Sequence, residues 1–90
     1  MESRTPQSVQ SVERTLELLE LLTTYKDGLP LSLLSQQAGL KPSTTHRLLQ
    51  TLLQRGYVKQ NAASKVYSLG PRVLVMGNAY LDGCNLYSEA

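Results

Sequence analysis

Apolar residues recur at helical spacing in several segments of the chain, separated by turn residues. In the first segment, "VERTLELLELLTTY" (residues 12–25), they stand at intervals of three and four, which predicts an amphipathic helix with Ser11 as its N-cap. The apolar arc of this helix spans about 220° at 100° per residue, whereas one core needs little more than 100°. The excess predicts a second apolar contact for this helix.

Two further helices are predicted close together. Ser32 can cap a short helix that stops at Gly39, the usual left-handed terminator. Pro42, a residue favoured in the first helical turn, begins a third helix that runs to about Arg55 and is closed by Gly56. A short helix, a tight turn and a longer helix indicate a helix-turn-helix.

The remaining sequence predicts a hairpin and a last helix. "YVKQ" and "VYSL" read as two short strands around the connection "NAASK", and "LPL" (29–31) is long enough only for a strand stub. Gly70-Pro71 opens a helix in which apolar residues recur at intervals of three and four: Val73, Met76, Tyr80, Cys84 and Tyr87. We therefore expect a mainly α fold with a small β-hairpin: a flexible arm (1–10), a winged helix-turn-helix (11–70) and a linker helix (71–90).

The third predicted helix has two chemically different faces. On a helical wheel, one face gathers Thr45, Leu48, Leu49, Leu52 and Leu53. The opposite face gathers Ser43, Arg47, Gln50 and Gln54, flanked by Thr44, His46 and Thr51. Arg and Gln are the side chains that read guanine and adenine in the major groove, and Ser or Thr contacts phosphate or base. This outward face therefore indicates recognition of DNA.

The charge distribution favours the same function. The net charge is only +2, but residues 28–81 contain no Asp or Glu. The same segment carries these bases: Lys41, Arg47, Arg55, Lys59, Lys65 and Arg72. Such a segment attracts polyanions. The alternative is a winged helix that binds a protein partner without reading DNA, but its third helix would more often present Leu, Phe or Met outward.

Three stretches, "QSVERTLELLELL", "LPLSLLSQQAGLKPSTTHRLLQTLLQRGYV" and "YSLGPRVLVMG", together resemble the DNA-binding domain of the IclR family of bacterial transcriptional regulators. The resemblance covers roughly residues 9–86. It implies a winged helix-turn-helix and a linker helix, followed by an effector-binding domain that this chain lacks. Members are dimers, often paired into tetramers, that repress or activate transcription in response to small molecules. The usual alanine of the second helix is Ser35 here.

The resemblance also implies specific contacts with an operator or promoter in double-stranded DNA. The matching positions on the third helix are Ser43, Thr44, Thr45, His46, Arg47 and Gln50, and the wing adds Lys59 and Lys65. In the family, the chain leading into the first helix lies near the DNA backbone. Arg14 can therefore contact phosphate, or it can pair with Glu17 within the helix.

Self-association is expected through the first and last helices. A lone winged helix buries only one side of each, and the apolar side chains that remain normally mark an interface. The expected contact residues are Leu18, Leu21, Tyr25, Val73, Met76 and Tyr80.

Several other classes of function are disfavoured. Cys84 is the only cysteine, and His46, the only histidine, has no nearby acid, so we expect no disulfide, metal site, cofactor or catalytic set. No run approaches the roughly 18 apolar residues of a membrane span, and the polar start "MESRTPQSVQ" lacks a signal core. A cytoplasmic protein without a membrane partner is expected.

Overall fold

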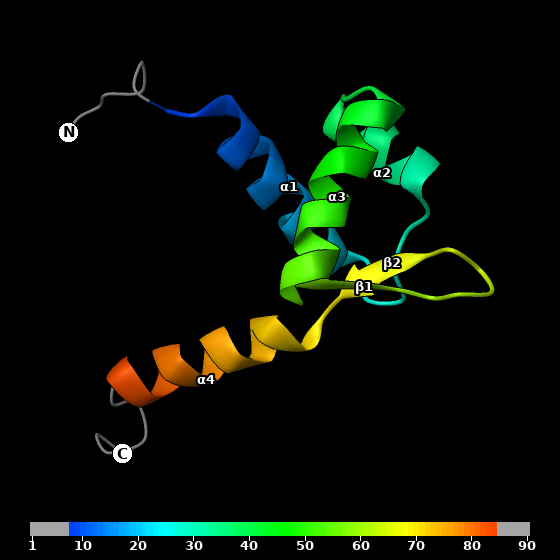
Figure 1. Cartoon of the computed structure of the whole chain (residues 1–90). Coiled ribbons are helices and arrows are strands. Elements are labelled where there is room, and N and C mark those ends of the chain that lie inside the picture. Colours follow the sequence, from blue (N-terminus) through cyan, green and yellow to red (C-terminus); the bar gives the residue numbers. More distant parts are fainter. Residues whose placement is uncertain (1–7, 85–90) are drawn as a thin grey trace.

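The computed structural model describes residues 8–84, in which four helices and two strands follow one another (Figure 1). Their bounds are α1 (Gln10–Thr24), α2 (Leu31–Ala38), α3 (Pro42–Arg55), β1 (Val58–Gln60), β2 (Tyr67–Leu69) and α4 (Pro71–Cys84). The predicted mainly α fold with a small hairpin is confirmed. Most of the expected arm and the last part of the expected linker helix, including Tyr87, lie outside the described residues.

The hairpin pairs β1 with β2 in antiparallel register, with Val58 opposite Leu69 and Gln60 opposite Tyr67. Leu29 adds one bridge at the edge of β2, because its N–H donates to the Tyr67 carbonyl and the Tyr67 N–H donates to the Leu29 carbonyl, both at 2.9 Å. The predicted strand stub at residues 29–31 is therefore a single bridge. It ties the connection between α1 and α2 to the wing.

One apolar core joins α1, α2 and α3 to the hairpin. Its members are Leu18, Leu22, Leu29, Leu34, Leu49, Leu52, Val58 and Tyr67. Burying a leucine fully is worth roughly 1.5–3 kcal/mol, so these side chains hold the three helices and the wing in one body. Residues 10–69 form this body.

The predicted ends of α2 and α3 are confirmed. Gly39 and Gly56 take left-handed backbone angles (φ 69° and 86°), and Pro42 stands in the first turn of α3. Glycine adopts this conformation without the steric cost that a Cβ adds, so both helices stop where the sequence predicts.

The predicted caps of α1 and α2 are wrong. The first helix already begins at Gln10, with Val9 at the capping position, so the boundary of the expected arm also shifts. The second begins at Leu31, one residue before Ser32. Pro30 precedes it in extended conformation, and its carbonyl accepts the N–H of Leu34, so the helix starts before the serine hydroxyl can cap it.

The last helix, α4, extends away from the body and buries no side chain (Figure 1). Its start is nevertheless fixed, because the Gly70 N–H donates to the Tyr57 carbonyl (2.8 Å) and the Arg72 N–H donates to the Gly56 carbonyl (3.0 Å). The direction of α4 is therefore set by hydrogen bonds to the end of α3.

Candidate nucleic-acid interface

The two faces of α3 separate in the structure as its sequence pattern predicts. Leu49 is completely buried and Leu52 nearly so, and both pack in the core. On the other side, Ser43, His46, Arg47 and Gln50 are exposed, and Thr44 is half-buried. The core contact of the leucines therefore orients a row of hydrogen-bonding side chains toward solvent.

Thr45 does not belong to that row. It is completely buried, and its hydroxyl donates to the Lys41 carbonyl one turn earlier, at 3.1 Å. Its expected placement among the side chains that contact DNA is wrong, because the helical period places it on the same side as Leu49. The hydroxyl instead satisfies a backbone carbonyl at the start of α3.

The two lysines predicted for the wing are both exposed. Lys59 lies on β1, and Lys65 lies in the connection between the strands, where it is the one described non-glycine residue with a positive φ (68°). A lysine in this conformation is uncommon, so the surrounding turn must hold it there. The structure therefore separates the two lysines along the hairpin.

Asn61 organises the turn around Lys65. Its side-chain oxygen accepts the N–H groups of Ala63 and Ser64, both at 2.9 Å, and its carbonyl accepts the N–H of Lys65 at 2.8 Å. The Gln60 side chain also donates to the Lys65 carbonyl at 3.1 Å. These hydrogen bonds together make the tip of the wing an ordered turn.

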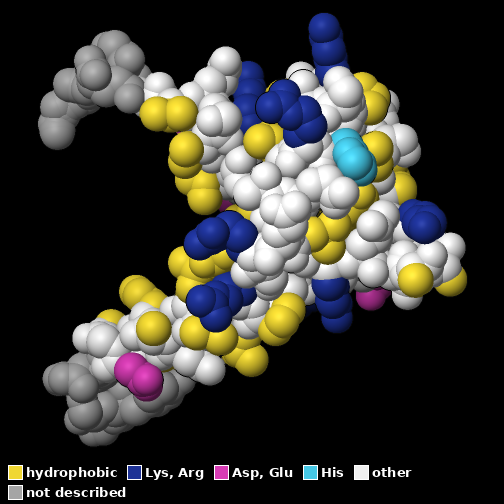
Figure 2. All heavy atoms as spheres, viewed as in Figure 1, with side chains coloured by type: hydrophobic (Ala, Val, Ile, Leu, Met, Phe, Trp, Pro, Cys, Tyr) yellow, Lys and Arg dark blue, Asp and Glu magenta, His cyan; other side chains and the backbone are white. Residues whose placement is uncertain are grey.

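Positive charge extends beyond the predicted residues on this side of the body. Figure 2 shows Lys and Arg side chains over the face that carries α3, with few acidic side chains in view. Lys41, which occupies the N-cap position of α3, is exposed, as are Gln54 and Arg55 near the other end of the helix. None of these three residues is among the predicted DNA contacts, although Lys41 and Arg55 are bases of the acid-free segment and the helical wheel places Gln54 on the outward face.

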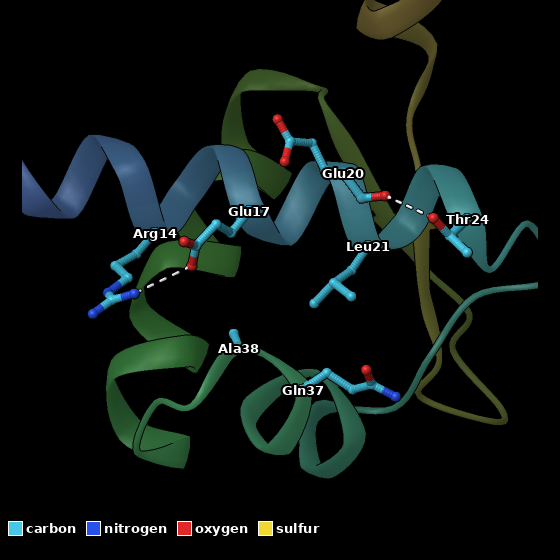
Figure 3. Close-up of a pocket in the computed structure, with 7 residues that line it drawn as sticks. All are labelled: Arg14, Glu17, Glu20, Leu21, Thr24, Gln37 and Ala38. Carbon is cyan, nitrogen blue, oxygen red and sulfur yellow. Dashed lines mark hydrogen bonds and ion pairs between the residues drawn. The ribbon is translucent and has the colours of Figure 1, made fainter.

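Arg14 takes the second of its two predicted alternatives. It pairs with Glu17 within α1 at 3.3 Å. The pair lines a shallow groove between α1 and α2, beside Leu21 and Gln37 (Figure 3). This guanidinium therefore has a carboxylate partner in its own helix.

The predicted self-association residues divide into two groups. Leu18 is completely buried and Leu21 partly buried against the core, so the assignment of Leu18 to an exposed contact face is wrong. Tyr25, Met76 and Tyr80 are exposed, and Val73 is half-buried. The reason for the error is that α1 turns its Leu18 side inward.

Other exposed apolar side chains were not among the predicted self-association residues. These are Val9, just before α1, Val12 and Leu16 on α1, and Leu74 and Val75 on α4. Val12 and Leu16 follow helical spacing, so the pattern identified a stripe but not its direction. The outward apolar side of α1 is the one formed by these residues.

The described residues were also compared with the requirements of a metal site and of a membrane-spanning helix. Within residues 8–84, no group of three or more His, Cys, Asp or Glu side chains could hold a metal ion. No helix of the same range is both long and apolar enough to cross a membrane.

Three packed helices, a hairpin after the third helix and a solvent-facing polar side on that helix define a winged helix-turn-helix of the DNA-binding type. A family model described as the IclR helix-turn-helix domain matches residues 11–62, more than half of the chain. The chain belongs to the IclR family, whose members matched here are named as transcriptional repressors and regulators, not enzymes.

Curated relatives match nearly the whole chain but only a part of their own length. The chain is 41% identical over 78 residues to the acetate operon repressor of Salmonella typhimurium, covering 87% of this chain and 28% of that protein. It is also 41% identical over 85 residues to the DNA-binding transcriptional repressor YiaJ of Escherichia coli, covering 94% and 30%. The chain thus spans less than a third of the length of these two relatives.

Solved structures share the fold at similar coverage. An IclR-family transcriptional regulator from Brucella abortus matches with a TM-score of 0.79 and 33% identity, over 97% of this chain and 32% of that one. HmgR from Pseudomonas aeruginosa matches with a TM-score of 0.80 and 34% identity, over 91% and 35%. The winged helix and the start of α4 therefore follow the architecture of known regulators.

Proposed function

We propose that this chain is the operator-reading part of a transcriptional regulator and binds a specific sequence in double-stranded DNA. The observation that carries the proposal is the exposed face of α3, which presents hydroxyl, amide, imidazole and guanidinium groups without a carboxylate. A carboxylate there would repel phosphate, and the groups present are those that bind bases and phosphates. In this proposal α3 enters the major groove.

Within the site, we assign different roles to different residues. Arg47 and Gln50 lie on the outward face at least one turn into α3, where a helix in the major groove reaches base edges. Ser43 and Thr44 lie in the first turn, where the free N–H groups and the helix dipole favour an anion such as a phosphate. His46 lies beside them on the exposed side.

The wing supplies the remaining contacts. Lys59 and Lys65 are both exposed and are separated along the hairpin, so they can neutralise phosphates on either side of the groove that α3 occupies. Lys41, exposed immediately before α3, adds a further positive charge at the helix start. These lysines strengthen binding to any duplex, whereas Arg47 and Gln50 select among sequences.

We further propose that the regulator acts as a dimer in the cytoplasm, with α1 and α4 forming the contact between subunits. Support comes from the apolar side chains that both helices leave exposed, among them Leu16 and Met76. A small-molecule effector, and any pairing of dimers into tetramers, would act through parts of the regulator beyond this chain. Accordingly, calorimetry of the 90-residue chain with small organic acids and aromatics should show no saturable binding.

The central experiment is selection of bound duplexes from a random pool, followed by salt titration of the best binder. We expect a consensus half-site and a log affinity that falls linearly with log salt. Recovery of only random sequences, with equal affinity for scrambled duplexes, would contradict sequence-specific recognition. In that case a protein partner for α3 would become the better explanation.

A further inference from the structure

A groove at the junction of α3 and α4 carries two arginines. Arg55, the last residue of α3, and Arg72, in the first turn of α4, are both exposed and line this groove together. Leu53, Pro71 and Val75 supply its apolar walls. Figure 2 shows Lys and Arg side chains where α4 leaves the body, in the same view as those over α3. The groove therefore combines apolar walls with two positive charges.

Backbone contacts bring the two arginines together, although they belong to different helices. The Arg72 N–H donates to the carbonyl of Gly56, the residue directly after Arg55, at 3.0 Å. A Cβ built on Gly56 would lie 3.7 Å from the Arg72 Cβ, so the Arg72 side chain begins against the end of α3. The origin of each side chain is thus fixed, whereas the long arms that carry the guanidinium groups can adjust to a ligand.

Neither guanidinium is neutralised by another described residue. The one ion pair between described residues joins Arg14 to Glu17 on α1. No Asp or Glu occurs in residues 28–81, and Asp82 follows Arg72 by ten residues, which is about 15 Å along a helix. Two like charges side by side repel each other, so the groove favours an anion that contacts both.

The end of α3 does not account for the pair. A base in the last turn of a helix often hydrogen-bonds the free carbonyls there. The last carbonyls of α3 already have backbone donors, because the Leu52 carbonyl accepts the Tyr57 N–H at 2.9 Å. Likewise, the Leu53 carbonyl accepts the Gly56 N–H at 3.1 Å. The two guanidinium groups are therefore not required to satisfy the helix end.

The groove is continuous with the outward face of α3. Gln54 shares the exposed side of this helix with Arg47 and Gln50. It also lines the groove that Arg55 and Arg72 occupy. Arg47 and Arg55 are eight residues apart, which is about 12 Å along the helix and about 80° around it. Because the major groove is about 12 Å wide, Arg55 reaches a strand at its edge when Arg47 lies over its floor.

We propose that the arginine pair is a phosphate-binding site, which holds the backbone of the same duplex whose bases α3 reads. A guanidinium presents its N–H groups in a planar fork that matches the oxygens of a phosphate, and apolar walls that limit access of water strengthen such a contact. The proposal rests on the DNA binding proposed above. It adds the start of α4 to the surface that contacts DNA.

The site should contribute affinity and not sequence preference, because phosphates are common to every duplex. Arg47 and Gln50 then keep the reading of bases, and the lysines of the wing hold phosphates elsewhere. Since Arg72 belongs to α4, the contact also attaches the start of that helix to the duplex.

The first test compares the 90-residue chain with an Arg55→Ala, Arg72→Ala variant on the duplex recovered by selection. Both side chains are exposed, so the variant should keep the melting temperature of the wild type. We expect affinity to fall roughly tenfold for cognate and scrambled duplexes alike. The slope of log affinity against log salt should decrease by about two units, because each lost phosphate contact removes about one. Arg55→Lys, Arg72→Lys keeps both charges and should keep most of the slope.

The second test locates the contact on the duplex. In a series of duplexes, each carries one uncharged methylphosphonate in place of a phosphate. The wild type should lose affinity wherever a contacted phosphate is neutralised. The Arg55→Ala, Arg72→Ala variant should become insensitive at the phosphates that the arginines bind and stay sensitive at all others, whereas Lys65→Ala should lose sensitivity at different positions.

Arg14→Ala provides the matched control, because it removes the same side chain where Glu17 is its ionic partner. It should leave the salt slope and the pattern of sensitive phosphates unchanged. If the double alanine variant has wild-type affinity and slope, the arginines bind no phosphate, and a carboxylate of a protein partner becomes the better occupant of the groove. Equal sensitivity of variant and wild type at every phosphate also overturns the proposal.

Failure of this proposal is distinguishable from failure of DNA binding itself. A wild-type chain that binds no duplex refutes both. A wild type that selects a consensus, together with an unaffected double alanine variant, refutes only the phosphate site at the junction.

Discussion

Helices α3 and α4 have the same length, 14 residues, but relate to the rest of the molecule in opposite ways. The third helix buries Thr45, Leu49 and Leu52 and turns its polar side to solvent. The last helix has no fully buried side chain, although apolar residues lie almost all around it. A helix with one apolar face finds its partner within the body, whereas a helix that is apolar on several faces requires a partner elsewhere.

The two helices also differ in what fixes their position and orientation. The position and orientation of α3 come from the core, because its leucines pack against α1, α2 and the hairpin. For α4, the described structure provides only a tether at its start, formed by the N–H groups of Gly70 and Arg72. The body should therefore fold without α4, whereas α4 should become stable when its apolar side chains are covered.

The largest expected effect comes from truncating one leucine in each helix. Leu49→Ala should lower the free energy of unfolding by about 2–5 kcal/mol, because it removes a completely buried side chain and leaves a cavity. Leu74→Ala, at a position that is 66% exposed, should change it by less than about 0.5 kcal/mol. Urea denaturation of both variants measures the contrast, and equal losses would contradict the division between the two helices.

Alanine at two glycines should produce effects of opposite sign. A Cβ at Gly70 would lie 2.5 Å from the Gly56 carbonyl oxygen and 2.9 Å from the Val58 nitrogen, so Gly70→Ala should destabilise the body by about 2 kcal/mol. At Gly77, within α4, a Cβ meets nothing within 4 Å. Gly77→Ala should therefore add helix stability of roughly 0.5–1 kcal/mol. Thermal unfolding followed by circular dichroism tests both predictions. If Gly70→Ala has the melting temperature of the wild type, the backbone around Gly56 and Val58 can shift to accept the Cβ at little cost.

The outward face of α3 should account for sequence preference. Arg47→Ala should cost about 1–3 kcal/mol on the selected duplex and relax the preference at one base pair. Lys65→Ala should weaken all duplexes alike and reduce the slope of log affinity against log salt by about one unit. Titrations with cognate and scrambled duplexes separate the two roles. Equal losses on both duplexes for Arg47→Ala would assign base reading to Gln50 instead.

The smallest effect concerns a polar group inside the body. The Ser35 hydroxyl on α2 is buried and has no hydrogen-bond partner within the described residues. Ser35→Ala should therefore raise the free energy of unfolding by about 1 kcal/mol, because an unsatisfied buried hydroxyl is removed. Ser32→Ala, at an exposed position of the same helix, serves as the control and should be nearly neutral. A loss of stability in Ser35→Ala would indicate a partner such as a buried water.

Local signals made α3 and its outward face predictable. Pro42 and Gly56 act on the backbone of their own helix ends, so their effects do not depend on distant residues. The polar face was predictable because one helical period separates it from the leucines of the same helix. Thr45 was the exception: the resemblance to the family assigned it to the DNA side, whereas its position in the helical period placed it in the core.

The caps of α1 and α2 could not be predicted from the serines. Ser11 and Ser32 have the chemistry of an N-cap, but each helix begins before its serine. At α2, the bridge between Leu29 and Tyr67 fixes the chain just before Pro30 and so decides where the helix starts. That bridge joins residues far apart in the sequence, and no local pattern contains it.

The sequence by itself determined the order of the elements, the bounds of α3, the hairpin and the acid-free polar face, because each depends on neighbouring residues and on helical or strand periodicity. Only the tertiary structure decided which side of α1 faces the core. Its apolar arc is wide enough for either choice, and packing against α2 and α3 selected Leu18 and Leu22 for burial while leaving Val12 and Leu16 exposed. The direction of α4 also depends on the tertiary structure, because backbone hydrogen bonds to Gly56 and Tyr57 set it.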